Sequence, residues 1–263
     1  MNLENTARGL NAVRSKSPLV HNITNYVVMN NTANALLAIG ASPVMAHAID
    51  EVADMVAIAS SLVINIGTLS GHWIDSMQVA GKTAVERDIP RILDPVGAGA
   101  TPLRTETCKT LLKSMKPTVI RGNASEIMAL AGSAVTTKGV DSSAESTRAV
   151  DAARQLAQAT GAVVVISGAI DYITDGERLK EIKLGSPLMA QVTGMGCTAT
   201  AVIGAFAAVV SDPFEAAWQA MTLMGVAGQR AARQARGTGT MQIAFLDELS
   251  TLTAEDILSE KGA

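Results

Sequence analysis

Residues 62–94 read LVINIGTLSGHWIDSMQVAGKTAVERDIPRILD, in which a short apolar run, 62–66, precedes a glycine-bearing turn, an amphipathic segment, 74–87, and a second apolar run, 91–93. Short apolar runs bounded by turn residues are typical of buried strands, whereas apolar residues that recur every three or four positions are typical of helices. The order strand, helix, strand is the repeating unit of α/β folds, in which consecutive strands lie parallel. We therefore expect this stretch to form one such unit.

The same alternation repeats along much of the chain and predicts a mainly parallel sheet flanked by helices. The expected strands are 19–22, 43–46, 62–66, 91–93, 118–121 and 163–167. The expected helices are 2–15, 27–39, 52–59, 74–87, 105–113, 125–131 and 143–158. The alternation repeats too often to be accidental, so the expected fold class is α/β.

The alternation ends after residue 167. Residues 172–174, the turn Asp175-Gly176 and the segment 178–184 are typical of an antiparallel hairpin, because Asp-Gly favours a two-residue turn. Helical patterns then follow at 199–210, 213–235 and 241–251. The sheet should therefore end in an antiparallel edge. Because no linker or repeat divides the sequence, we expect a single domain over residues 1–263.

The composition is that of a globular protein whose partners are small molecules. The chain has 263 residues, of which 48% are hydrophobic and 17% charged, so it can bury a large core. Its net charge is -3 and its basic residues are scattered, which argues against binding to nucleic acid or to a membrane surface. Its 2 cysteines are too few for a disulfide framework, and no cysteine and histidine cluster has zinc spacing.

The sequence predicts neither secretion nor a membrane span. Residues 1–8 are polar and lack an apolar signal segment. The longest apolar run, 199–210, is shorter than the roughly 20 residues that cross a bilayer. We expect a cytoplasmic protein.

Residues 192–200, VTGMGCTAT, have the features of an anion site beside a reactive group. Gly194 and Gly196 stand before the expected helix 199–210, and the start of a helix presents unpaired N–H groups and the positive end of its dipole. The same field should lower the pKa of the Cys197 thiol from about 8.5, so that the sulfur could accept a proton. The alternative is a flexible glycine turn followed by a small buried cysteine.

A second phosphate motif fails on inspection. Gly81-Lys82-Thr83 resembles the end of a P-loop, but that motif requires a glycine five positions before Gly81, where Ser76 stands. The segment also lies within an expected helix rather than between a strand and a helix. A solvated lysine on a helix is the better interpretation.

Carboxylates follow two of the expected strands, where the ligands of α/β sheets gather. Asp94 follows 91–93 and could hold Mg²⁺ through water, or it could form an Asp-Pro turn or cap the next helix. Asn123 and Glu126 lie on one face of a first helical turn. They could share the hydration shell of a metal ion, or they could form a capping box.

Two more residues at strand ends suit a nucleotide. Arg121 is a cation that could hold phosphate oxygens, although a surface ion pair is the commoner role of an arginine. Ser167 and Gly168 could meet a phosphate or a ribose, or they could form a simple β-turn.

The order of these segments resembles that of the hydroxyethylthiazole kinases, a family of the ribokinase-like superfamily. The segments that carry the resemblance are VHNITN at 20–25, GASPVM at 40–45, LDPVGA at 93–98, RGNASE at 121–126, Asp171-Tyr172 and GMGC at 194–197. The resemblance implies a three-layer sandwich around a central, mainly parallel sheet. It also implies transfer of the ATP γ-phosphate to the hydroxyl of 4-methyl-5-(2-hydroxyethyl)thiazole, a step of thiamine salvage, in a homotrimer with thiazole pockets at its subunit contacts.

The resemblance further implies roles for the matching residues. Gly194 and Gly196 match the family's anion hole, and Cys197 stands where most ribokinase-like enzymes have an aspartate base, as is typical of the thiazole kinases. Glu126 with Asn123 is expected to form a Mg²⁺ site, and the position of Asp94 after a strand adds it to that site. Arg121 and Ser167 are expected to contact ATP. Met45, Gly194 and Asn25 are expected to contact the thiazole.

Two residues depart from the family pattern, and three rival functions stay open. The family commonly has Thr or Ala where Met195 stands, which affects the shape of the pocket, and Thr where Ser167 keeps the hydroxyl. Hydroxymethylpyrimidine kinase shares the superfamily, but Cys197 and the segment 21–25 argue against it. A dehydratase of hydrated NAD(P)H has a similar fold, but its relatives carry aspartate in place of Cys197. The third rival is a regulator that binds ATP without consuming it.

Overall fold

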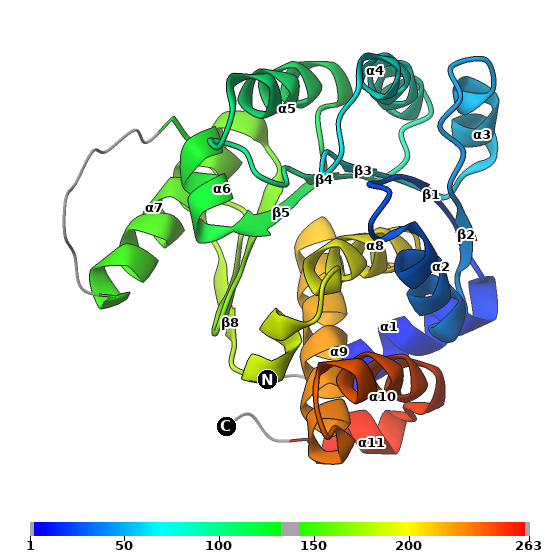
Figure 1. The fold of residues 1–263 in the computed structure, drawn as a ribbon, viewed down its shortest axis with the longest axis vertical. Coiled ribbons are helices and arrows are strands. Elements are labelled where there is room, and N and C mark those ends of the chain that lie inside the picture. The colour runs from blue at the N-terminus through cyan, green and yellow to red at the C-terminus, as the bar shows by residue number, and fades with distance from the viewer. Residues whose placement is uncertain (1–2, 133–141, 261–263) are drawn as a thin grey trace.

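A mainly parallel sheet of eight strands, in the order β2-β1-β3-β4-β5-β6-β7-β8, forms the centre of the computed structural model (Figure 1). The structure describes residues 3–132 and 142–260. Helices cover both faces of the sheet, which gives three layers. The prediction of an α/β three-layer sandwich is confirmed.

The six parallel strands match the six expected from the sequence. They are β1 (Leu19–Ile23), β2 (Ser42–Val44), β3 (Ser61–Asn65), β4 (Arg91–Asp94), β5 (Val119–Asn123) and β6 (Val163–Ser167). Their register aligns the carboxyl ends, since Asn65 lies opposite Asp94 and Asn123 lies opposite Ser167. Polar residues that are far apart in the sequence are thereby brought to one edge of the sheet.

The middle of strand β3, residues 62–64, is apolar because both faces of the strand are buried. Successive side chains of a strand point to opposite faces. Accordingly Leu62 and Ile64 belong to one buried cluster, and Val63 belongs to the other. A strand covered on both sides has no solvated face, so its sequence reads as a continuous apolar run.

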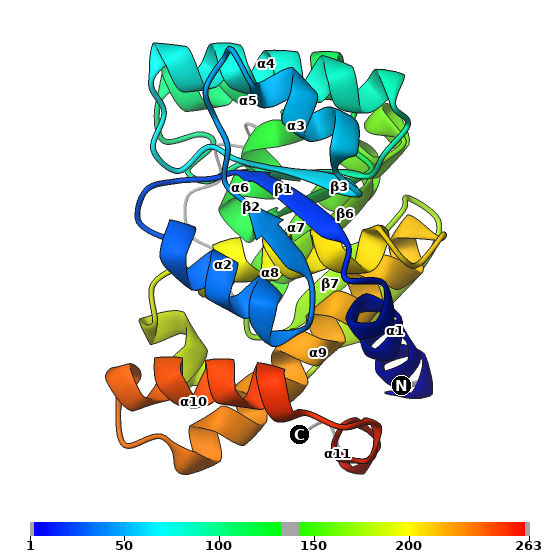
Figure 2. The same cartoon turned by 90° about the vertical axis from the view of Figure 1, so that its right-hand side faces the viewer.

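The helices divide between the two faces of the sheet (Figure 2). One face is covered by α3 (Val52–Ile58), α4 (Gly71–Glu86), α5 (Pro102–Met115), α6 (Ala124–Leu130) and α7 (Ser142–Thr160). The other is covered by α1 (Leu3–Lys16), α2 (Met29–Ala38), α8 (Met195–Ala207) and α9 (Pro213–Gln234), with α10 (Thr238–Thr251) and α11 (Ala254–Ser259) outside them. Asn2, the expected first residue of the first helix, lies outside the described residues.

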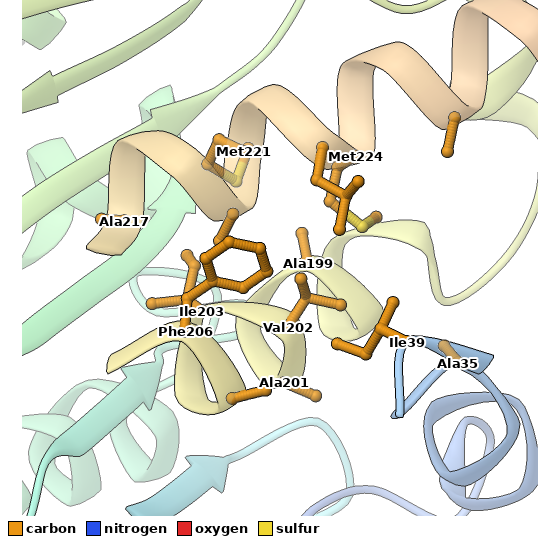
Figure 3. Packing of buried hydrophobic residues seen from close by; sticks show 14 of the residues in the cluster. Ala35, Ile39, Ala199, Ala201, Val202, Ile203, Phe206, Ala217, Met221 and Met224 are labelled. Atoms are coloured by element: carbon orange, nitrogen blue, oxygen red, sulfur yellow. The ribbon is translucent and has the colours of Figure 1, made fainter. Parts of the chain in front are cut away.

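Helix α8 is buried along almost its whole length, between the sheet and α9. In Figure 3 its apolar side chains lie among those of α9, such as Met221 and Met224, and near Ala35 of α2. This burial fixes the helix firmly, so its first turn is held at a defined place beside the sheet.

The hairpin is present, but its turn is longer than predicted. Strands β7 (Asp171–Thr174) and β8 (Leu179–Ile182) pair antiparallel, and Thr174 lies opposite Leu179, which leaves residues 175–178 as the loop. The two-residue Asp-Gly turn is therefore wrong. Asp175 Oδ1 accepts hydrogen bonds from the N–H groups of Glu177 and Arg178, and these bonds stabilise the wider loop.

Two short helices were not predicted. The 3-10 helix η1 (Pro187–Gln191) begins with a proline after Ser186, which accepts a hydrogen bond from Leu188 N–H. Helix α11 begins with a capping box of Thr253 and Asp256, a local signal that could have revealed it.

Candidate active site

Polar side chains at the carboxyl ends of β1, β3 and β4 form a continuous line of hydrogen bonds. Asn25, which follows β1, donates from Nδ2 to Asn65 Oδ1 at 2.9 Å. Asn65 ends β3 and donates from Nδ2 to Asp94 Oδ2, at the end of β4, at 2.8 Å. All three side chains are buried. The order of the strands in the sheet thus joins residues that are dozens of positions apart.

Helix α8 begins at Met195 rather than at residue 199, so Gly196 and Cys197 lie in its first turn. Gly194 is the N-cap, and its φ of 84° is a left-handed conformation that glycine adopts readily. The first bond within the helix runs from Thr198 N–H to Gly194 O at 2.8 Å. The N–H groups of residues 195–197 therefore have no acceptor within the helix, and no side chain caps them. Such a helix start suits an anion.

Cys197 lies at this open helix start, within reach of the line of amides. Its sulfur accepts a hydrogen bond from Asn25 Nδ2 at 3.5 Å, and the residue is half-buried. Burial, followed by the negative charge of Asp94, raises the pKa of the Cys197 thiol to about 11. The prediction of a lowered pKa is therefore wrong, because burial and the charge of Asp94 outweigh the hydrogen bonds from Asn65 and Asn25 and the charge of Arg121.

Asp94 is fully buried and holds together three elements. Its Oδ2 accepts from Asn65 and from Thr200 Oγ1 of α8, both at 2.8 Å, and lies 3.8 Å from Arg121 Nη1. Burial raises the pKa of Asp94 to about 6, against the opposing effect of the Arg121 charge. Its second oxygen, Oδ1, has no hydrogen-bond partner among the residues that the structure describes.

Arg121 connects Asp94 to the start of α8. Its Nη2 donates to Ser167 Oγ at the end of β6. Its guanidinium also lies against the backbone of Gly196, where an added Cβ would be 2.5 Å from Nη1. Arg121 and Ser167, both expected to contact ATP, are thus in direct contact, and a side chain at position 196 would displace the guanidinium. Their contacts with ATP stay a prediction.

A cavity of about 740 Å³ opens beside Arg121. Its polar lining includes Arg121, Ser167 and Asp171, and its apolar lining includes Met195, Met221 and Met224. A cavity of this size, lined by a cation and by apolar side chains, suits a nucleotide.

Glu126 and Asn123 form a capping box, one of the two structures expected for this pair from the sequence. Glu126 Oε2 accepts from Asn123 N–H at 2.8 Å, and Asn123 Oδ1 accepts from Glu126 N–H at 2.9 Å. Glu126 Oε1 accepts from Gly97 N–H, in the loop after β4, at 2.8 Å. The carboxylate therefore joins the ends of β4 and β5.

The two carboxylates fit a hydrated Mg²⁺ ion. Asp94 has an unpartnered oxygen, and each oxygen of Glu126 has a lone pair beyond its one hydrogen bond. Mg²⁺ keeps several waters and is commonly held by one or two carboxylates together with substrate phosphates. Within the described residues no cluster of three or more His, Cys, Asp and Glu could hold a metal by itself.

Met45 lies apart from this line of contacts. It follows β2 at the edge of the sheet, is half-buried, and its backbone carbonyl is 3.2 Å from His47 Nδ1. The structure thus joins Asn25 to Cys197 directly but gives Met45 no such link. Its expected contact with the thiazole stays a prediction.

Sequence reasoning missed Asn65 and Thr200, which hold Asp94 in place. The one available signal for Asn65 was an amide within an otherwise apolar strand. Thr200 carried no local signal, because its partner is 106 residues away in the sequence.

Known proteins that resemble this chain identify its family. The model of the hydroxyethylthiazole kinase family matches residues 10–255. The chain belongs to the hydroxyethylthiazole kinase family. It is 55% identical over 261 residues to the hydroxyethylthiazole kinase of Leptospira biflexa, covering 99% of this chain and 98% of that protein. It is 54% identical over 249 residues to that of Nitratidesulfovibrio vulgaris strain DP4, covering 95% of this chain and 93% of that protein.

Solved structures of other kinases share the fold of this chain. The structure of a hydroxyethylthiazole kinase from Pyrococcus horikoshii OT3 superposes with a TM-score of 0.90 at 40% identity, covering 97% of this chain and 96% of that one. A pyridoxal kinase from Bacillus subtilis, in complex with ADP, superposes with a TM-score of 0.60 at 19% identity over 80% of this chain and 91% of that one, which is a likeness of fold alone. The family match does not favour the dehydratase or the hydroxymethylpyrimidine kinase.

Among the helices that the structure describes, none combines the length and the apolar character needed to cross a membrane.

Proposed function

We propose that the chain transfers the γ-phosphate of ATP to the hydroxyl of 4-methyl-5-(2-hydroxyethyl)thiazole, a step of thiamine salvage. One observation carries the proposal beyond family membership. The uncapped start of α8 carries Cys197, which contacts Asn25, and it is approached at Gly196 by Arg121, which lines the cavity. A phosphoryl group held at this helix start would have an alcohol site on one side and a nucleotide site on the other.

The protein's main contribution to catalysis is positioning and neutralisation of charge. Phosphoryl transfer passes through a loose transition state whose negative charge is spread over the equatorial oxygens. The free N–H groups at the start of α8 and the guanidinium of Arg121 converge on the same place, and preorganised donors of this kind stabilise developing charge. Mg²⁺, held by Asp94 and Glu126 through water, would neutralise charge on the ATP phosphates.

We propose that the thiolate form of Cys197 accepts the alcohol's proton, late in the reaction. With a pKa of about 11 the thiolate is a small fraction of the protein at neutral pH, so the base contribution of Cys197 is modest. The hydrogen bond from Asn25 orients the sulfur. We expect Asn25, Met45 and Gly194 to line the thiazole, with ATP held by Arg121 and Ser167.

The subunit arrangement of the family is supported by the exposed apolar residues around the β1 and β2 loops. Tyr26 and Val27 follow β1 and are 62% and 66% exposed, Leu37 is 59% exposed on α2, and Ile49 is 48% exposed after β2. Apolar side chains that gather on a surface commonly mark a contact between proteins. We propose that a homotrimer covers them, and that each chain, residues 1–263, is a single domain that works in the cytoplasm, where ATP is made.

An ADP-release assay tests the function. Purified protein, ATP and Mg²⁺ are incubated with hydroxyethylthiazole, with hydroxymethylpyrimidine or with no acceptor. We expect ADP only with the thiazole. Release with the pyrimidine instead would assign the chain to that related activity, and binding of ATP without release would favour the lyase or the silent ATP-binding regulator.

A further inference from the structure

Arg104, near the start of α5, binds the backbone of two loops that each support one half of the site. Its Nη1 donates to Ile66 O at 2.9 Å and to Val96 O at 2.7 Å, and its Nη2 donates to Gly67 O at 2.8 Å. Ile66 and Gly67 follow β3, and Val96 follows β4. One planar guanidinium therefore joins the ends of two neighbouring strands through three carbonyl groups.

The loop after β3 supports the acceptor side of the site. Gly67 N–H donates to Asn65 Oδ1 at 2.9 Å. An added Cβ on Gly67 would lie 2.6 Å from Asn25 Nδ2, so the Asn25 side chain packs directly on this backbone. Because Asn25 in turn contacts Cys197, the position of this loop sets the position of the sulfur.

The loop after β4 supports the metal side. Val96 is followed by Gly97, whose N–H binds Glu126 Oε1 at 2.8 Å. Gly97 has a φ of +73°, and an added Cβ there would be 3.1 Å from Arg104 Cδ, so the Arg104 side chain lies along this loop. Asp94, the last residue of β4, directly precedes the same loop.

We propose that Arg104 is a positioning residue for phosphoryl transfer, which fixes the acceptor side of the site, Asn25 and Cys197, relative to the metal side, Asp94 and Glu126. The inference rests on the proposed kinase function. Arg104 acts through the two loops and not through substrate. A lysine could not replace it fully, because an ammonium group lacks the planar fork that spans three carbonyls.

Arg91, the first residue of β4, offers a matched control, because it lies at the end of β4 opposite to the loop that Arg104 binds. Its Nε donates to Lys116 O at 3.0 Å, and its Nη1 donates to Ile89 O at 2.6 Å and to Ala84 O at 3.4 Å. Like Arg104 it binds three backbone carbonyls, but it does so at the amino end of the sheet. Arg91→Met should therefore remove comparable bonds without disturbing the site.

The kinetic test compares Arg104→Met, Arg104→Lys and Arg91→Met with the wild type. In Arg104→Met we expect kcat to fall about tenfold or more and the KM for the thiazole to rise, since small misplacements of reacting groups are costly. The KM for ATP should change less than about twofold, because Arg121 and Ser167 lie on strands that Arg104 does not touch. Arg104→Lys should be intermediate, and Arg91→Met should keep kcat and both KM values.

Alkylation of Cys197 gives a second readout that needs no activity. Iodoacetamide labelling at pH 8.5 is followed by mass spectrometry of the peptide that contains Cys197. We expect Cys197 to react several-fold faster in Arg104→Met than in the wild type or Arg91→Met, since the packing of Asn25 against it is loosened. If Arg104→Met fails to fold, Arg104→Lys should show a smaller increase of the same kind.

The outcomes separate the inference from the proposed function. A wild type inactive toward the thiazole would refute the function, while the alkylation rates would still decide the role of Arg104. Equal alkylation in all the variants, or equal losses of kcat in Arg104→Met and Arg91→Met, would overturn the positioning role.

Discussion

Helices α6 and α8 both begin at the carboxyl edge of the sheet, but they begin in opposite ways. At α6, Asn123 and Glu126 bind each other's backbone N–H groups in a capping box. At α8, the N-cap is Gly194, which has no side chain to offer, and the N–H groups of the first turn have no partner within the helix. One start is closed by the chain itself, whereas the other is left open.

The difference shows how the sequence assigns two tasks to similar local structures. A side-chain cap satisfies the first N–H groups of a helix and stabilises it by about 1 kcal/mol. A glycine N-cap gives up part of that stability and leaves the same groups to a ligand. For α8 the loss is tolerated because nearly all of the helix is buried between the sheet and α9.

Gly196→Ala should have the largest effect, because it obstructs the open start. The new Cβ would lie 2.5 Å from Arg121 Nη1 and 2.7 Å from Nη2, so the guanidinium must move away. We expect kcat/KM for ATP to fall on the order of 100-fold, as when a preorganised donor is lost. Steady-state kinetics measure the change, and urea unfolding should show a stable protein.

Gly71→Ala is the matched control for that substitution. Gly71 is the first residue of α4, and an added Cβ there meets nothing within 4 Å. Its kinetics should equal those of the wild type. If Gly196→Ala were as active as Gly71→Ala, then the contact between Arg121 and the α8 start would have no part in catalysis.

Cys197→Ala removes the reactive group while leaving the open start intact. We expect kcat to fall about 10- to 100-fold, a modest share of what general base catalysis can contribute, with a smaller change in KM. Cys197→Ser, which keeps an acceptor for Asn25, should retain more activity than Cys197→Ala. Turnover of Cys197→Ala equal to that of the wild type would dismiss the role of the sulfur as a base.

Glu126→Gln tests the closed start, because it removes the charge and leaves one acceptor oxygen where Glu126 uses two. Glutamine can complete the capping box with Asn123 N–H, but Gly97 N–H then loses its acceptor, so the free energy of unfolding should fall by about 1 kcal/mol or more. The Mg²⁺ concentration for half-maximal rate should rise about tenfold, as for a residue that supports a metal site. Glu106→Gln, on the exposed surface of α5, is the control. An unchanged Mg²⁺ titration would remove Glu126 from the metal site.

Most of the fold could be predicted from the sequence because its signals are local. The run 62–64 is apolar because β3 is covered on both faces, and the other parallel strands follow the same rule. The start of α8 was placed too late, because Gly194 and Gly196 have no helical pattern of their own. The hairpin loop was misjudged because Asp175 binds backbone groups that the Asp-Gly pair does not reveal.

The site could be predicted only in part. Asp94, Arg121 and Glu126 could be proposed as site residues because the sequence places each at or just after the end of an expected strand, and those ends meet at one edge. Asn65 was missed because its partners come from other strands. The direction of the Cys197 pKa depends on burial by distant elements, which the residues 192–200 cannot report.

The turn after β6 is a third strand end, and like α6 it is closed by the chain. Gly168 N–H donates to Asp171 Oδ1 at 3.0 Å. Burial raises the pKa of Asp171 to about 6, although this hydrogen bond and the charge of Arg121 oppose the shift. Closure by a carboxylate should therefore be unfavourable when that carboxylate is ionised.

Asp171→Asn should show this cost as a small, pH-dependent gain in stability. Because the folded pKa lies above the unfolded value of about 3.9, the folded state binds the proton more tightly, and stability falls as the pH rises from about 4 to about 6. Asparagine keeps the acceptor for Gly168 N–H but carries no charge. We expect urea unfolding at pH 8 to show a gain of about 1 kcal/mol, less than the full shift would give because Asp171 is only half-buried, and no gain at pH 4. Asp50→Asn, at an exposed turn, should gain at neither pH. An equal gain at both values would mean that the amide improves the turn itself, and that the charge of Asp171 has no cost in the folded protein.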